Sequence, residues 1–151
     1  MKALLIVDIQ EPYFLKYDAS LLIKINKRIL EAQEQKQEII YIKNTKRLRS
    51  GSITDDFACG LLVKTDNVFC KEQADLFSSE ELLAFLKSKN ISDVEIIGID
   101  GNSCISASAK GAIKKGYVVS VDLDCIGVAN PLRFEKTKET LSVMGVILKQ
   151  S

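Results

Sequence analysis

The residue of this chain best suited to covalent chemistry is Cys104, which follows an apolar run and precedes a stretch of small residues. Residues 94–99 are largely β-branched, as expected for a strand covered on both faces of a parallel sheet. A helix is predicted to begin near the cysteine and to end at Gly116. A thiol at a helix start meets backbone N–H groups and the positive end of the dipole, which favour a thiolate and can hold an oxyanion. A buried structural thiol is the alternative reading of Cys104 alone.

Two further reactive side chains stand at equivalent places. Asp8 ends the apolar run of residues 3–7, and Lys71 follows the short predicted strand 67–70. Because parallel strands end at one rim of a doubly wound sheet, Asp8, Lys71 and Cys104 are expected to converge there. A carboxylate can take and return the thiol proton, and an ammonium can stabilise the thiolate or orient the carboxylate. Separately they could be a helix cap, a surface charge and a core thiol, but their coincidence at three strand ends favours a shared site.

The elements that would position these residues alternate along the chain. Strands are predicted at 3–7, 38–43, 67–70, 94–99, 117–121 and 146–148. The helices between them include one after Asp18 or Ser20, one opened by a capping box of Ser78 and Glu81, and one over 134–144 with Leu141 and Val143 facing inward. This alternation predicts one domain over residues 1–151, a three-layer α/β/α sandwich on a mostly parallel, roughly six-stranded sheet.

The composition narrows the classes of partner. Lys plus Arg total 21 and Asp plus Glu total 20, which gives no electrostatic reason to expect nucleic acid or a membrane surface. A small-molecule substrate is the expected partner. No signal-peptide pattern or membrane-length apolar run occurs, so we expect a cytoplasmic protein in which the four cysteines remain thiols. The absence of histidine excludes a Ser-His or Cys-His pair and disfavours a zinc site.

A basic run follows the second predicted strand. Lys46, Arg47 and Arg49 stand beside Ser50-Gly51-Ser52. Such a run can recognise a phosphate, but a solvated loop is the more frequent case and is favoured here. Neither G-x-x-x-x-G-K-[ST] nor G-x-G-x-x-G is present, so no nucleotide-binding loop is predicted.

Three segments resemble the isochorismatase-like cysteine hydrolases, a family that includes nicotinamidases and N-carbamoyl amidohydrolases. They are ALLIVDIQEPY, KEQADLFSSEELLAFLKSKNISDVEIIGIDGNSCISASAKGAIKKGY and VSVDLDCIGV, and together they span most of the chain. The middle segment is the most specific, because its lysine, Phe77, strand and cysteine follow in family order and at family-like spacing.

The resemblance implies a cofactor-free hydrolase in which Cys104 is the nucleophile, Asp8 the general base and acid, and Lys71 the third member of a triad. It also implies a cis peptide at Asp100–Gly101. The backbone amides of this loop, including those of Gly101 and Cys104, would face the substrate oxyanion. The substrate would be a small amide, carbamoyl or related compound that passes through a thioester. Family relatives are commonly oligomeric, so a homo-oligomer is expected. We further place Gln10, Phe14 and Phe77 near the substrate.

The chain departs from the family pattern in three places. Gly101 and Asn102 stand where a threonine and an aspartate are usual, and the segment after the second strand is shortened. Asn44-Thr45-Lys46 stands where nicotinamidases carry an aspartate and histidines for a metal, so a metal-dependent nicotinamidase is disfavoured. Two other hypotheses remain open: a non-catalytic member that binds a small molecule or a partner protein, and a thiol redox sensor that pairs Cys104 with Cys70.

Overall fold

One parallel sheet organises the computed structural model, which describes residues 1–45 and 56–150. The described strands form a six-stranded sheet in the order β3-β2-β1-β4-β5-β6. These strands are β1 (Lys2–Val7), β2 (Glu38–Asn44), β3 (Val68–Lys71), β4 (Asp93–Ile99), β5 (Val118–Gly127) and β6 (Ile147–Lys149). The α-helices are α1 (Glu11–Phe14), α2 (Ser20–Glu34), α3 (Glu80–Ser88), α4 (Ser106–Lys114) and α5 (Pro131–Val143).

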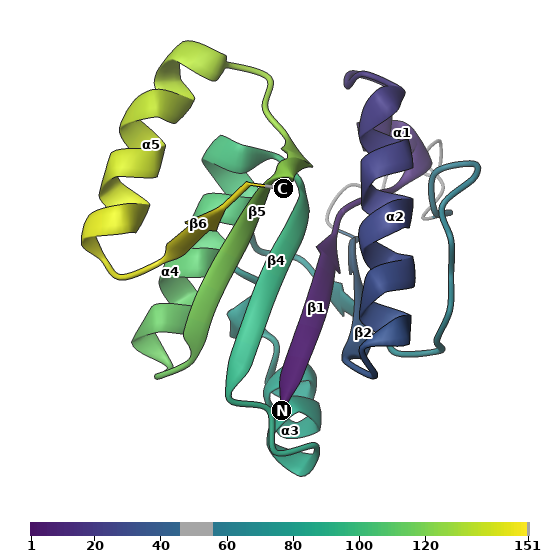
Figure 1. Cartoon of the computed structure of the whole chain (residues 1–151), viewed down its shortest axis with the longest axis vertical. Coiled ribbons are helices and arrows are strands. Elements are labelled where there is room, and N and C mark those ends of the chain that lie inside the picture. Colours follow the sequence, from purple (N-terminus) through teal and green to yellow (C-terminus); the bar gives the residue numbers. More distant parts are fainter. Residues whose placement is uncertain (46–55, 151) are drawn as a thin grey trace.

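Helices cover both faces of this sheet, with α2 on one side and α4 and α5 on the other (Figure 1). Alternating strand residues point to opposite faces. In β1, Leu4 and Ile6 join the core beneath α2, whereas Leu5 and Val7 join the core shared with α3, α4 and α5. The apolar runs of the sequence therefore reflect burial on both faces, and the predicted three-layer α/β/α fold is confirmed.

The strand order creates a crevice beside β1 and β4. These two strands are neighbours in the middle of the sheet, and the chain leaves them toward opposite edges. In open parallel sheets such a reversal of strand order is where ligands bind, outside the carboxyl ends of the strands. Asp8 and the loop after Ile99 both lie at this point.

Three local predictions were wrong. The cap of α3 is the Ser79 side chain, which accepts from the N–H of Leu82, because a short 3-10 turn already includes Ser78. Val143 is exposed, since it lies about 200° around the helix from the inward-facing Leu141. Strand β5 continues to Gly127 beyond an irregularity in its pairing with β4, where the Asp124 N–H bonds the Asp122 side chain.

No helix in the described part of the chain is long and apolar enough to cross a membrane.

Candidate active site

Asp8 stands immediately after β1 with its backbone in the left-handed region, at φ 58°. A non-glycine residue there is uncommon, and such conformations cluster at functional sites. The side chain is buried; Oδ2 accepts a hydrogen bond from Lys71 Nζ at 3.2 Å. Oδ1 is also buried and has no hydrogen-bond partner among the described residues. The carboxylate therefore keeps one acceptor for a proton or a polar ligand.

Lys71 is the last residue of β3 and is buried as deeply as Asp8. Its ammonium donates to Asp8 Oδ2 at 3.2 Å, to the Gln73 carbonyl at 3.1 Å and to Cys104 Sγ at 3.3 Å. A lysine ammonium has three protons, so these contacts use all of them. The lysine is thereby held between the carboxylate and the thiol.

Cys104 lies in a single π-helical turn, Gly101–Ile105, that joins β4 to α4. Asp100 organises this turn. Its carbonyl accepts from the N–H groups of Ser103 and Ile105, and its carboxylate accepts from the N–H of Asn102 at 2.9 Å. The prediction that a strand delivers this cysteine to the start of a helix is confirmed.

The Asp100 carboxylate also joins the turn to its surroundings. Its Oδ1 accepts from the Tyr17 hydroxyl at 2.9 Å and from the Ala129 N–H at 2.8 Å. These side-chain hydrogen bonds hold the turn in place, because it lies outside the hydrogen-bonded strands of the sheet. The cis peptide bond lies between Ile99 and Asp100, one residue earlier than predicted from the resemblance.

Gly101 and Asn102, which depart from the expected family pattern in this turn, fit against α5. A Cβ at Gly101 would come within 2.8 Å of both Phe134 and Val128, so only glycine fits there. Asn102 donates to the Asn130 carbonyl at 3.0 Å and accepts from the Thr137 hydroxyl at 2.7 Å. Gly101 and Asn102 thus form part of a packed contact between the turn and α5.

The electrostatics place the shared proton on sulfur at rest. Burial raises the pKa of Asp8, although Lys71 opposes this shift. Burial and the Asp8 charge raise the pKa of the Cys104 thiol above its ordinary 9.0, and the Lys71 ammonium only partly offsets them. The helix start was expected to favour a thiolate, but desolvation and a neighbouring carboxylate outweigh that effect. The resting pair is a thiol beside a carboxylate.

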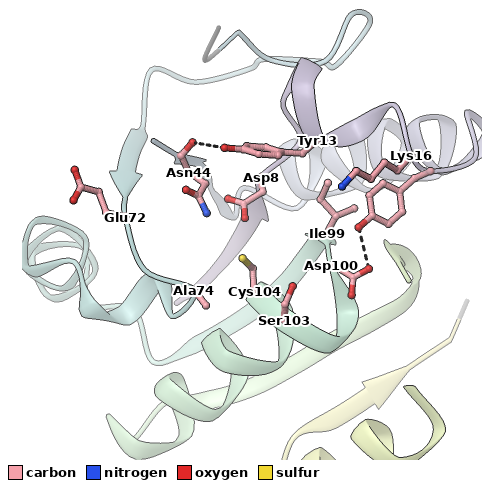
Figure 2. A pocket seen from close by; sticks show the side chains of 11 residues that line it. Asp8, Tyr13, Lys16, Asn44, Glu72, Ala74, Ile99, Asp100, Ser103 and Cys104 are labelled. Carbon is pink, nitrogen blue, oxygen red and sulfur yellow. Dashed lines mark hydrogen bonds between the residues drawn. The ribbon is translucent and has the colours of Figure 1, made fainter. Parts of the chain in front are cut away.

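A cavity of about 600 Å³ opens over these residues and has the volume of a small-molecule site. Figure 2 shows Asp8 and Cys104 facing one another within it. The other lining residues lie at the same rim, in α1, at the ends of β2 and β4, in the π-helical turn and in the adjoining loops: Tyr13, Lys16, Tyr17, Asn44, Glu72, Ala74, Ile99, Asp100 and Ser103. Most of these residues were not predicted from the sequence. Those within residues 13–17 were missed because this segment shows no periodicity, and its place soon after β1 was the one available signal.

The three residues that we placed near the substrate do not line this cavity. Gln10 is fully buried and exchanges hydrogen bonds with the Asn44 backbone. Phe14 packs in the core beneath α2, and Phe77 packs in the opposite core against Tyr117. Gln10 therefore supports the cavity wall through Asn44, whereas Phe14 and Phe77 are core residues.

The end of β2 does not offer a metal ion suitable ligands. Its last residue is Asn44, and the Thr45 hydroxyl is directed to the Lys71 carbonyl at 3.3 Å. The described residues include no group of three or more acidic, cysteine or histidine side chains arranged for a metal. The basic segment Lys46, Arg47, Arg49 lies outside the described residues.

Cys70, the partner of Cys104 in the redox hypothesis, does not face Cys104. Cys70 directly precedes Lys71 in β3, and successive strand residues face opposite sides of the sheet. Lys71 faces Cys104, so Cys70 faces away from it and is exposed. All four cysteines are free thiols in the structure.

Comparison with known proteins agrees with this architecture. The isochorismatase domain model matches residues 2–149. The pyrazinamidase of Pyrococcus horikoshii, solved in complex with zinc, has a TM-score of 0.85 at 20% identity and covers 99% of each chain. The nicotinamidase of Staphylococcus aureus has a TM-score of 0.82 at 22% identity, covering 99% of this chain and 98% of its own.

A third neighbour is the N-carbamoylsarcosine amidase of Thermoplasma acidophilum. Its TM-score is 0.80 at 17% identity, with coverage of 99% of this chain and 95% of its own. No curated protein sequence matches. At these identities the structural likeness shows a shared fold, while the domain match extends over nearly the whole chain. The chain therefore belongs to the isochorismatase family, a family of hydrolases with amidases among its structural neighbours.

Proposed function

We propose that this protein is a cysteine hydrolase that cleaves a small amide or carbamoyl compound through a thioester, with Asp8, Lys71 and Cys104 as its catalytic residues. One observation carries the proposal: a single buried ammonium contacts the Asp8 carboxylate at 3.2 Å and the Cys104 sulfur at 3.3 Å, beside an open cavity. A nucleophile, a base and an orienting group within hydrogen-bond reach of one another form the arrangement that acyl transfer requires.

The first half-reaction begins with the thiol. Its proton moves to Asp8 as the sulfur attacks the substrate carbonyl, and an S–C bond forms. Asp8, whose raised pKa helps it to hold a proton, then protonates the leaving nitrogen, and the C–N bond breaks. Ammonia or an amine departs, and an acyl or carbamoyl thioester remains on Cys104.

The second half-reaction consumes water. Asp8 takes a proton from the water, whose oxygen attacks the thioester carbonyl. The S–C bond breaks, and the proton returns from Asp8 to the sulfur. The sum of both halves is amide plus water giving acid plus amine, and the thiol is regenerated. Lys71 keeps its three contacts and holds both partners in place throughout.

The negative oxygen of each tetrahedral intermediate needs donors. Asp100 already holds the amides of Asn102, Ser103 and Ile105. We assign the oxyanion to the remaining amides of the turn, those of Gly101 and Cys104. Preorganised backbone donors of this type typically contribute about 3 kcal/mol each to an acyl-transfer barrier.

The direct test is ammonia release from a panel of small amides and ureido compounds, with the parent beside Cys104→Ala and Asp8→Asn. We expect Cys104→Ala to lower kcat by about a thousandfold or more, and Asp8→Asn by about a hundredfold or more. Rapid acid quenching of the parent should trap a mass adduct on Cys104. Cys70→Ala is the matched control, because it removes a thiol that faces away from the cavity.

The alternative hypothesis, a non-catalytic protein that binds a small molecule, predicts the opposite result. If the parent binds a compound from the panel but releases no ammonia, and Cys104→Ala binds it equally well, the protein is a binding member of the fold. Hydrolysis that survives in Cys104→Ala would also overturn the proposed mechanism.

A further inference from the structure

Most polar groups on the cavity wall already have partners. Asp8 pairs with Lys71, and Asp100 accepts three hydrogen bonds through its carboxylate. The Tyr17 hydroxyl is used by Asp100, and the Tyr13 hydroxyl lies 3.4 Å from the Asn44 carbonyl. A substrate must therefore be recognised chiefly by the groups that remain.

Two charged side chains on the wall have no partner among the described residues: Lys16 and Glu72. Figure 2 shows them on opposite sides of Cys104. The Lys16 ammonium points into the space above Asp100 and Ile99, whereas the Glu72 carboxylate points away from Cys104. Lys16 is thus the free charge directed at a substrate bound over the thiol.

The other charges near Lys16 leave it available. The Asp100 carboxylate keeps its charge, but its oxygens are already engaged by three neutral donors, and the Asp8 charge is balanced by Lys71. Lys16 itself lies in the short loop between α1 and α2 and is exposed, so its ammonium can adjust to a ligand of modest size. A carboxylate is an organic anion that can pair with such an ammonium through a charge-assisted hydrogen bond.

We propose that Lys16 is a specificity-determining residue and that the substrate is an amide or ureido derivative of a carboxylic acid, bound through its carboxylate. This inference rests on the proposed hydrolase function. It excludes neutral aromatic amides as the preferred substrates. The carboxylate contact exists in both the bound substrate and the transition state, so it should act mainly on KM.

Matched substrates test this without changing the reacting group. Succinamate has a carboxylate where 4-oxopentanamide has a neutral methyl ketone of similar shape, and N-carbamoylglycine pairs in the same way with carbamoylated aminoacetone. We expect the parent to favour each carboxylate by about tenfold in kcat/KM, the size of a charge-assisted hydrogen bond at a partly exposed site. The preference should shrink with added salt, because salt screens exposed charges.

Variants then assign the preference to one residue. Lys16→Met should raise KM for the carboxylates about tenfold and leave the neutral compounds unchanged, while Lys16→Arg should retain the preference. Lys24→Met is the matched control: it removes the same charge from α2, where Lys24 lines neighbouring hollows but not this cavity.

The outcomes separate the two proposals. If no compound is hydrolysed in a Cys104-dependent way, the proposed function fails, and the inference about Lys16 fails with it. If hydrolysis depends on Cys104 but neutral compounds are preferred, or Lys16→Met keeps the carboxylate preference, only the inference about Lys16 is overturned. An equal loss in Lys24→Met would also overturn it, because the effect would then be one of overall charge.

Discussion

At the residue scale, the position of one proton distinguishes this site from a thiolate site. A thiolate enzyme keeps its cysteine charged through a neighbouring cation. Here Asp8 and burial raise the pKa of Cys104, and Lys71 serves both neighbours at once. In the proposed mechanism the nucleophile therefore forms only when Asp8 takes the proton, which would couple deprotonation of Cys104 to attack.

This coupling predicts opposite effects of one substitution on two reactions. Asp8→Asn should lower the rate of the proposed hydrolysis by about a hundredfold or more, yet speed alkylation of Cys104 by iodoacetamide below pH 9, because it removes the charge that raises the thiol pKa. Lys71→Met should slow alkylation, since the ammonium lowers that pKa. The measurement is the labelling rate against pH, with the modified cysteine located by mass.

The exposed Cys70 provides an internal control in the same sample, and its profile should be unchanged. If Asp8→Asn slowed alkylation of Cys104, the carboxylate would be sustaining a reactive thiolate, and the resting state inferred here would be incorrect.

At the element scale, the close approach of β1 and β4 sets how near Asp8 lies to Cys104. Gly98 of β4 pairs with Val7, the residue before Asp8. Its φ is 123°, and a Cβ there would overlap the Val7 carbonyl oxygen. A side chain does not fit at this position, and its φ is one that L side chains rarely adopt, so glycine permits the two strand ends to meet.

Gly98→Ala should therefore lower the free energy of unfolding by roughly 3 kcal/mol or more, because it adds a backbone clash to an unfavourable φ. Urea denaturation measures this change. Gly116→Ala is the matched control: its φ is 91°, but a Cβ there would meet nothing within 4 Å. It should cost only about 1–2 kcal/mol, the penalty of the left-handed conformation. Equal losses in both variants would show that the clash at Gly98 is relieved.

At the scale of the whole molecule, a buried carboxylate joins elements that are distant in sequence. Glu95 of β4 is fully buried. It pairs with Arg28 of α2 at 2.7 Å, Lys2 of β1 at 3.0 Å and Lys149 of β6 at 2.8 Å. Burial alone would raise the pKa of Glu95, but these partners outweigh it and lower the pKa from 4.5 to about 2.

The shift predicts acid destabilisation with a defined sign. A pKa lowered on folding contributes stability above the unfolded value of 4.5, and this contribution is lost as the pH falls toward 2. A shift of this size corresponds to on the order of 3 kcal/mol. The measurement is unfolding free energy against pH for the parent and Glu95→Gln, whose difference should shrink by that amount between pH 6 and pH 2.

Taking the difference between the two proteins removes groups that act the other way, such as Asp8, whose raised pKa favours folding at low pH. Glu135→Gln provides the control, because Glu135 forms an exposed pair with Lys138, and such pairs contribute little. If the difference in unfolding free energy between the parent and Glu95→Gln did not change with pH, these partners would not be lowering the pKa of Glu95.

The elements and the three reactive residues were predictable because local patterns encode them. Apolar runs marked the strands, and a charged or reactive residue at the end of three of them indicated the rim of the sheet. The helix stop at Gly116 was equally local, and the structure has it: α4 ends at Lys114, and Gly116 follows with a positive φ. The misplaced cap at Ser78 shows the limit of such patterns, since an adjoining turn decided which serine was used.

By itself, then, the sequence determined the α/β alternation, the parallel sheet and the convergence of Asp8, Lys71 and Cys104, because strand period and strand ends are properties of contiguous residues. Only the tertiary structure decided the protonation of Cys104, which residues form the cavity wall, and the place of the Lys16 charge on it. These depend on burial and on side chains from different loops, as where Tyr17 meets Asp100 across 83 positions of the chain. Desolvation and charge pairing act through space, and no spacing along the chain records them.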